Sequence, residues 1–353
     1  MTNHIHGGDI ITAKQQFSGD ILDFSANINP LGMPDEVKSA VLDSIEGSVH
    51  YPDPFCRKLT KGIAERDRVE PNYVLCGNGA ADLIFRLVFA TRPKEAMVTA
   101  PAFAEYEQAL TAGGCSVHYH FLLRENGFAL TDDILSSLHS GLDMLFLCNP
   151  NNPTGRQIEQ RLLTRILNRC VELNILLVLD ECFLELSDTE NREGLAPILA
   201  EYPNLFILRA FTKSYAIPGL RLGYCLSSNG RLISKLILAG QPWSVSAPAQ
   251  AAGIAALKCP DHPADARKII RTQREFLNRE MMALGLTVFS SAVNYILFST
   301  GGINDLKERM IKQGILIRSC ANYKGLGDDY YRVAVRQNAE NIRLVEALRE
   351  ALS

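Results

Sequence analysis

Residues 144–180 read MLFLCNPNNPTGRQIEQRLLTRILNRCVELNILLVLD and predict a strand, a helix and a second strand in succession. The runs at 144–148 and 175–179 consist almost entirely of apolar side chains. Between them, apolar side chains recur on one helical face, at Ile158, Leu162, Ile166, Leu167, Cys170 and Val171. Near-continuous apolar strands joined by helices are typical of a parallel sheet covered on both faces.

The same alternation extends from about residue 70 to residue 226. Further apolar runs lie at 73–76, 96–99, 205–208 and 223–226. We therefore expect a large, doubly wound α/β domain with a mainly parallel sheet.

Beyond Trp243 the pattern changes to a long helical stretch that ends near Leu284. Short strands at 286–289 and 295–298, a helix, two more short strands and a closing helix from about Ala339 follow, which predicts a smaller α+β domain. We expect an N-terminal arm at 1–45 that joins the small domain in part, a large domain at 46–243 and a small C-terminal domain at 244–353.

Composition narrows the class of protein. The chain has 353 residues, of which 47% are hydrophobic and 21% charged. Its net charge is −3, and it has no cluster of basic residues that would bind nucleic acid or an anionic membrane. Its nine cysteines include no CxxC pair, so we expect a reducing cytoplasm and neither disulfides nor a metal site. No leader or membrane span is expected from the apolar runs. A small-molecule enzyme fits these features best.

Three segments follow predicted strands, where open α/β sheets bind ligands. Asp180 can pair with the protonated pyridine nitrogen of a bound cofactor, or it can simply cap the next segment. The Gly-rich turn at 77–82 opens a helix and can hold a phosphate, or be only a loop. The turn at 149–155 can present Asn152 to a ligand, or serve only as a tight turn.

Lys213 lies eight residues before Arg221 in the run RAFTKSYAIPGLRLGY at 209–224. A desolvated lysine near a cation is neutral near pH 7 and can bind the aldehyde of pyridoxal phosphate covalently. Arg221 can be that cation and can also bind a phosphate through its planar fork. A solvated surface lysine is the alternative.

Taken in order, four of these segments resemble the fold-type I, pyridoxal-phosphate-dependent enzymes of the class I/II aminotransferase superfamily. They are 77–79, 152–155, 180–183 and 212–213 with Arg221. The histidinol-phosphate aminotransferase branch is the most similar, and within it other segments resemble the threonine-phosphate decarboxylases of cobalamin biosynthesis. Those segments are 6–9, 23–32, 101–106, 242–245, 317–323 and 330–336. The resemblance implies the aminotransferase-like fold, pyridoxal 5'-phosphate as cofactor and decarboxylation of L-threonine O-3-phosphate to (R)-1-aminopropan-2-yl phosphate.

The resemblance also implies residue roles. Lys213 would attach the cofactor covalently, Asp180 would bind its pyridine nitrogen, Asn152 its ring oxygen, and Phe103 would stack on its ring. The cofactor phosphate would be held by Gly79, Ala80, Ala81, Thr212, Arg221 and Tyr51 of a second subunit, which implies a homodimer.

On the substrate side, the resemblance assigns the carboxylate to Arg332 and the phosphate to Arg318 and His6. Gly7, Asn27 and Asn152 would complete the substrate site. From the residues alone, either Arg332 or Arg336 on the predicted strand can be a solvated charge, and motif agreement favours Arg332.

Two positions depart from the family pattern. Phe183 replaces a tyrosine and Ala210 replaces a hydroxyl residue, so two contacts to the cofactor are expected to be missing and its affinity to be somewhat weaker. Three alternative functions stay open: histidinol-phosphate amino transfer, decarboxylation of serine phosphate, and a cofactor-binding regulator. The regulator would need a DNA-binding module, and the first 40 or so residues show no such pattern.

Overall fold

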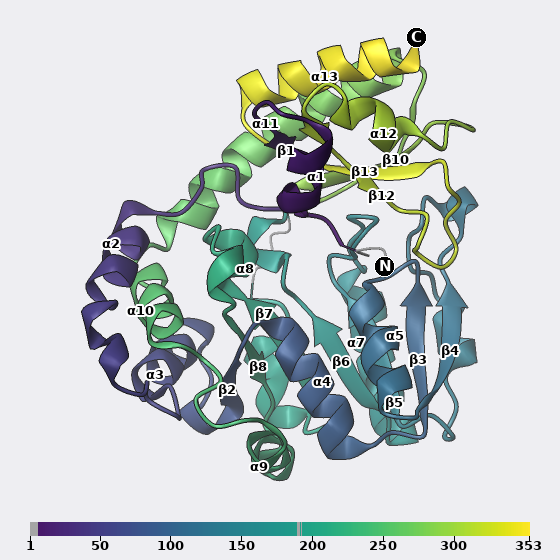
Figure 1. The fold of residues 1–353 in the computed structure, drawn as a ribbon. Helices are drawn as coiled ribbons and strands as arrows, with labels where there is room; N and C mark the ends of the chain where they lie inside the picture. Colours follow the sequence, from purple (N-terminus) through teal and green to yellow (C-terminus); the bar gives the residue numbers. More distant parts are fainter. Residues whose placement is uncertain (1–5, 189–190, 192) are drawn as a thin grey trace.

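The computed structural model describes residues 6–188, 191 and 193–353, and its centre is a sheet of seven strands (Figure 1). The strand order is β2-β8-β7-β6-β5-β3-β4. The strands are β2 Val74–Gly77, β3 Glu95–Ala100, β4 Ser116–Phe121, β5 Met144–Cys148, β6 Leu176–Asp180, β7 Leu205–Ala210 and β8 Gly223–Leu226. β8 alone runs opposite to the other six strands, so the expected mainly parallel α/β sheet is confirmed.

One strand of this sheet was not anticipated. β4 lies at the edge beside β3, and of its six side chains only His120 is buried. Its residues alternate between polar and apolar, as in a half-buried edge strand, but they lack the continuous apolar run on which the other strand predictions rest.

Helices cover both faces because strand side chains alternate between them. Leu145 and Leu147 of β5 belong to the core that includes α3 (Arg57–Asp67), α7 (Gln160–Leu173) and α10 (Ala247–Ala256). Met144 and Phe146 belong to the core that includes α4 (Ala80–Thr91), α5 (Ala104–Ala112) and α9 (Gly230–Ala239). The predicted helix after residue 158 is α7.

A second, antiparallel sheet has the order β12-β13-β10-β9. Its strands are β9 Thr287–Val288, β10 Tyr295–Ser299, β12 Arg318–Ser319 and β13 Tyr330–Ala334. Side chains of α11 (Asp261–Ala283), α12 (Leu306–Ile311) and α13 (Asn338–Leu352) form its core. The long helical stretch expected before Leu284 is two helices, α10 and α11, separated at residues 257–260.

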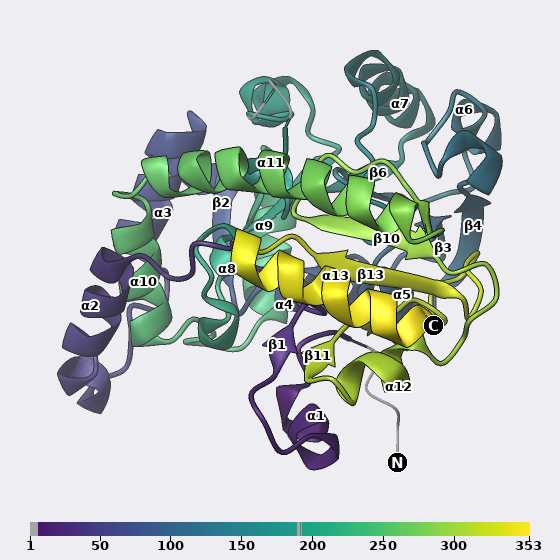
Figure 2. The ribbon, with the colours of Figure 1, turned by 90° about the horizontal axis from the view of Figure 1, so that it is seen from above.

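The N-terminal segment packs against this second unit. After α1 (Ile10–Gln16), β1 (Leu22–Asp23) pairs in parallel with β11 (Ile315–Leu316), and Phe24 enters the same core (Figure 2). The chain then passes to α2 (Asp35–Asp43), which contacts α10. The exact division at residues 45/46 and 243/244 stays a prediction.

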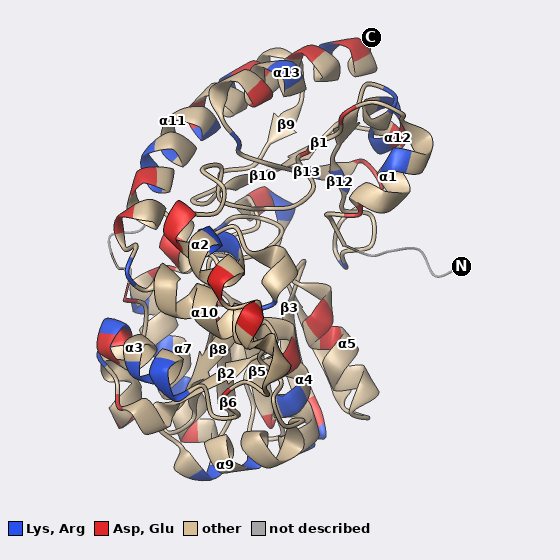
Figure 3. Ribbon diagram, turned by 60° about the vertical axis from the view of Figure 1, so that its left-hand side comes forward, with Lys and Arg blue, Asp and Glu red and all other residues tan. Residues whose placement is uncertain are grey.

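The outer helices α11 and α13 carry charged residues of both signs. Basic and acidic residues alternate along both helices (Figure 3). Within the described part of the chain, no helix is both long enough and apolar enough to cross a membrane.

Candidate active site

A cavity of about 440 Å³ is lined by the last residues of β5, β6 and β7 and, from the second sheet, by residues of β12 and β13. Thirteen of the predicted residues line it. They are His6, Gly7, Asn27, Ala80, Ala81, Phe103, Asn152, Asp180, Thr212, Lys213, Arg221, Arg318 and Arg332. Segments far apart in the sequence thus meet in one pocket, as expected for the edge of an open α/β sheet.

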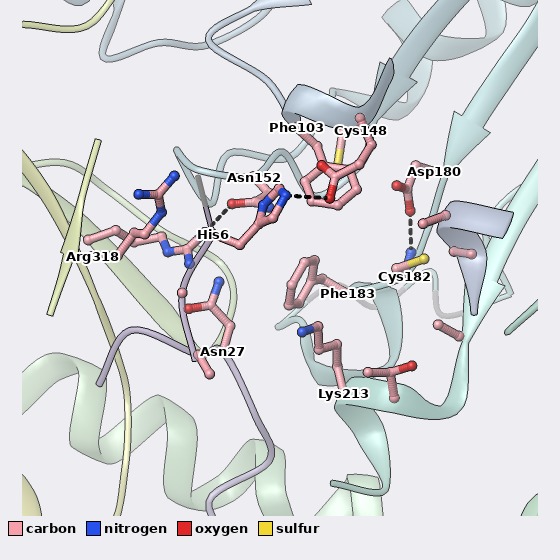
Figure 4. A pocket seen from close by; sticks show the side chains of 18 of the residues that line it. His6, Asn27, Phe103, Cys148, Asn152, Asp180, Cys182, Phe183, Lys213 and Arg318 are labelled. Atoms are coloured by element: carbon pink, nitrogen blue, oxygen red, sulfur yellow. Dashed lines mark hydrogen bonds and ion pairs between the residues drawn. The ribbon is translucent and has the colours of Figure 1, made fainter. Parts of the chain in front are cut away.

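Lys213 lies on the short helix α8 (Phe211–Ser214), which begins directly after β7. Burial, together with the charges of Arg332 and Arg221, lowers the pKa of the Lys213 amine to about 8. Its Nζ lies 6.0 Å from the centre of the Phe183 ring (Figure 4). A substantial fraction of this amine is therefore neutral near physiological pH, as a nucleophilic lysine requires.

Asp180 is the last residue of β6 and is anchored from two sides. The buried Tyr106 hydroxyl donates a hydrogen bond to Oδ2 at 2.5 Å, and the Cys182 backbone N–H donates to Oδ1 at 2.9 Å. These contacts fix the carboxylate at the pocket wall. The role of Tyr106 was not predicted, although the residue ends the segment 101–106 that carries the family resemblance.

An anion cradle lies where α4 begins. Gly79 precedes the helix with φ +81°, and a Cβ at this position would lie 2.8 Å from Arg221 Nη2. The first-turn N–H groups of α4, at Ala80 and Ala81, have no partner within the helix. Together with the Arg221 guanidinium they form a site that fits a phosphate such as that of pyridoxal phosphate.

The opposite wall carries two arginines. Arg318 of β12 pairs directly with Arg332 of β13 in the antiparallel register. Arg332 donates to the Asn152 side-chain oxygen and to the Ser25 carbonyl oxygen, the latter at 2.9 Å, while its buried Nε has no partner in the described structure. Two cations side by side in a pocket favour a ligand that carries more than one negative charge.

Of the two candidate arginines on β13 and just after it, only Arg332 lines the cavity. Arg336 donates to Glu340 and, at 3.0 Å, to the Asp23 carbonyl oxygen, and it does not line the cavity. Its two hydrogen bonds to Glu340 make it part of the start of α13.

Two residues from different segments meet at the mouth of the pocket. His6 Nε2 lies 3.2 Å from Glu105 Oε1, and the His6 ring lies 6.2 Å from the Phe103 ring (Figure 4). Burial, together with the nearby Asp180 charge, raises the pKa of Glu105 to about 7. Glu105 was not predicted, although it lies in the segment 101–106 that carries the family resemblance, because that segment was used only to place Phe103.

Other predicted features lie as follows. Phe183 and Ala210 both line the cavity and offer it no hydroxyl group. Tyr51 does not line it: the side chain is 79% exposed and stacks on Trp243 with ring centres 4.4 Å apart. A contribution of Tyr51 to a neighbouring subunit therefore stays a prediction.

Comparisons with known proteins agree with this architecture. The family described as aminotransferase class I and II matches residues 19–348. Threonine-phosphate decarboxylase of Salmonella typhimurium is 42% identical, and the alignment covers 99% of this chain and 97% of that protein.

Solved structures of two kinds of enzyme superpose closely. Histidinol-phosphate aminotransferase from Clostridium acetobutylicum gives a TM-score of 0.87 at 29% identity, covering 94% of this chain and 99% of that one. L-threonine-O-3-phosphate decarboxylase from Porphyromonas gingivalis gives 0.84 at 27% identity, covering 93% and 98%.

Proposed function

Because the chain belongs to the class I and II aminotransferase family, whose members use pyridoxal phosphate, we propose that it decarboxylates L-threonine O-3-phosphate to (R)-1-aminopropan-2-yl phosphate. The observation that carries the proposal is the pair Arg318 and Arg332, which lie side by side on adjacent strands in a pocket that also holds Lys213. An amino acid phosphate supplies one anion for each arginine. The 42% identity to the Salmonella typhimurium decarboxylase supports the same substrate.

Pyridoxal phosphate supplies, when bound, a cationic ring that accepts the electron pair released at the α-carbon of the substrate. We assign its attachment to Lys213, its pyridine nitrogen to Asp180, its ring oxygen to Asn152 and one ring face to Phe103. Its phosphate is assigned to Gly79, Ala80, Ala81, Thr212 and Arg221.

Arg332 orients the substrate. Its guanidinium is held by Asn152 and the Ser25 carbonyl oxygen, so a carboxylate bound to it has a fixed direction. Decarboxylation breaks the bond from the α-carbon to the carboxylate, whereas amino transfer breaks the bond to the α-hydrogen, so the direction in which the carboxylate is held decides between them. Arg332 is thus the residue we expect to select the reaction.

The remaining polar groups bind the other end of the substrate and move a proton. Arg318 and His6, with Gly7 and Asn27 of the same arm, are assigned to the phosphate. After carbon dioxide leaves, the α-carbon needs one proton, and we assign its delivery to Lys213 Nζ. We place the reaction in cobalamin biosynthesis and in the cytoplasm, in a homodimer.

The test is an assay with L-threonine O-3-phosphate that measures carbon dioxide and identifies the product by mass spectrometry. We expect one carbon dioxide for each aminopropanol phosphate formed. Histidinol phosphate with 2-oxoglutarate is the parallel assay, because an aminotransferase would use Arg332 for its dicarboxylate acceptor. Steady amino transfer without gas release would refute the decarboxylase assignment.

A further inference from the structure

Glu105 is a partly buried carboxylate in the active-site pocket for which the assigned reaction has no role. It lies in the first turn of α5, two residues after Phe103, and its side chain is 13% exposed. One carboxylate oxygen, Oε1, lies 3.2 Å from His6 Nε2. The other, Oε2, is buried and has no hydrogen-bond partner in the described structure.

A purely structural explanation does not account for this position. An acidic side chain in the first turn of a helix is stabilised by the helix dipole, but this effect operates equally well at the surface. Burying a carboxylate with one unpaired oxygen costs free energy. Glu107, two residues later, shows the ordinary arrangement: it is more exposed and pairs with Lys324 at 2.9 Å.

Charged and titratable groups face Glu105 from five segments. His6 approaches from the N-terminal arm, and Asp180, Lys213, Arg318 and Tyr323 interact with it electrostatically from β6, α8, β12 and the loop that follows. Burial raises the pKa of Glu105 to about 7, so part of this carboxyl is protonated near neutral pH. A proton can then be shared between the Glu105 carboxyl and the His6 imidazole, whose Nε2 lies 3.2 Å from Glu105 Oε1.

We propose that Glu105 is a positioning residue for His6: it binds the imidazole and keeps it protonated, so that the arm presents a cationic N–H donor to the phosphate of the substrate. With Nε2 directed to Glu105, Nδ1 is the ring nitrogen that donates to the phosphate. A phosphate dianion beside the pair draws the shared proton onto the imidazole, and the ionised Glu105 then stabilises the imidazolium. The inference rests on the proposed function for the presence of a substrate phosphate beside His6.

The test measures binding of two unreactive probes to the holoenzyme by titration calorimetry. 3-Phospho-D-glycerate carries a carboxylate and a phosphate but no amine, and D-glycerate lacks the phosphate. We compare wild type with Glu105→Gln, His6→Gln, the double variant and Glu107→Gln. Gln at 105 keeps the size and the acceptor oxygen but removes the charge, and Glu107→Gln is the matched control on the same helix.

We expect Glu105→Gln to weaken binding of the phosphorylated probe about tenfold at pH 7.5, as for loss of a charge-assisted contact, and to leave D-glycerate unchanged. His6→Gln should have a similar effect, and the double variant should be no weaker than His6→Gln alone. The affinity of wild type for the phosphorylated probe should fall as the pH rises past the imidazolium pKa. In Glu105→Gln this fall should occur about one pH unit lower, because the imidazolium has lost its carboxylate.

Two kinds of result overturn the inference, and only the first also contradicts the proposed function. If wild type binds the phosphorylated probe no more tightly than D-glycerate, the phosphate assignment of the proposed function fails as well. If wild type prefers the phosphorylated probe, two outcomes refute only the role of Glu105. In one, Glu105→Gln changes neither the affinity nor its pH profile. In the other, the double variant binds the probe more weakly than His6→Gln by the full factor that Glu105→Gln causes alone.

Discussion

At the scale of single residues, Lys213 has a pKa that can be tested without turnover. Burial, with the charges of Arg332 and Arg221, lowers this pKa to about 8. Only the neutral amine reacts with an aldehyde, so attachment of pyridoxal phosphate to the apoprotein should accelerate as the pH rises through 8 and level off above it. Stopped-flow absorbance of the cofactor measures this rate. A rate that keeps rising toward pH 10 would show that the amine is solvated.

The covalent bond itself is tested by Lys213→Ala. After borohydride reduction, mass spectrometry should find the cofactor mass on a wild-type peptide that contains residue 213 and on no peptide of the variant. Lys324→Ala is the control, since Lys324 lies on the loop between β12 and β13 and does not line the cavity. Labelling of the Lys213→Ala variant at another lysine would contradict the assignment.

Tyr106 positions the Asp180 carboxylate through a hydrogen bond. Its hydroxyl donates to Asp180 Oδ2 at 2.5 Å, and its ring stacks on Phe146 with centres 5.1 Å apart. Tyr106→Phe should keep the packing but free one carboxylate oxygen, and we expect kcat/KM for threonine phosphate to fall about tenfold. Tyr202→Phe removes an exposed hydroxyl and should change nothing. Equal kcat/KM for Tyr106→Phe and wild type would mean that Asp180 needs no such support.

The sequence revealed some of these residues and not others for a physical reason. Lys213, Asp180 and Asn152 lie just after apolar runs, so their place at a sheet edge could be predicted. Glu105 and Tyr106 lie on a helix, where contact with the pocket depends on how α5 packs against the sheet. Helical periodicity alone does not supply that packing.

At the scale of elements, α3, β6 and β7 are joined by a buried ionic cluster. Arg209 Nη2 lies 2.6 Å from Glu181 Oε2, and Arg209 Nη1 lies 3.2 Å from Asp67 Oδ2. Glu181 follows Asp180 and Arg209 precedes Ala210, so the cluster lies directly behind the pocket wall. It ties together the strand ends that present the cofactor residues.

Removing one member of this cluster should be costly. Arg209→Met leaves the Glu181 carboxylate buried without its guanidinium, and we expect a loss of about 3–5 kcal/mol in the free energy of unfolding. The double variant Arg209→Met with Glu181→Gln should recover part of this loss. Urea unfolding at fixed protein concentration measures both.

Arg169 provides the control for an exposed ion pair. It pairs with Glu172 at 2.8 Å, both side chains are exposed, and Arg169→Ala should cost about 0–1 kcal/mol. If Arg209→Met unfolded at the same urea concentration as Arg169→Ala, the cluster would not support the wall.

The elements themselves differ in how predictable they are. β5 and β8 match their expected ranges because each is a continuous apolar run between turns. The antiparallel direction of β8 was not predicted, since an apolar run has no direction. The available signal was the connection from β7, which contains no helix long enough to cross back over the sheet. β4 was not predicted because the prediction relied on continuous apolar runs, whereas its polar and apolar residues alternate.

At the scale of the whole molecule, overall similarity does not identify the reaction. The Clostridium acetobutylicum aminotransferase and the Porphyromonas gingivalis decarboxylase superpose on this chain with TM-scores of 0.87 and 0.84. The fold therefore sets the position of the pocket, and the reaction depends on the few residues that orient the substrate. The proposed site also includes a residue of a second subunit, and this contribution can be tested by experiment.

Tyr51 makes that contribution testable. Its ring is 79% exposed beside Trp243, and other exposed apolar side chains, Val49 and Phe55, lie within a few residues of it. In a twofold dimer the same surface meets itself, so each subunit can supply its Tyr51 to the other. Tyr51→Ala should then bind pyridoxal phosphate more weakly, and Lys213→Ala should be inactive.

Mixing these two inactive or weakened variants should restore activity. After unfolding and refolding together, each heterodimer has one site that combines the intact Lys213 of one subunit with the intact Tyr51 of the other. Random pairing gives this site about a quarter of wild-type activity at limiting cofactor. The control mixes Lys213→Ala with Asn152→Ala, because both residues lie in the pocket of a single chain and no heterodimer site is then complete. Equal activity in the two mixtures, or a monomer by sedimentation, would place Tyr51 outside the partner's site and leave the cofactor phosphate to Gly79, Ala80, Ala81, Thr212 and Arg221 alone.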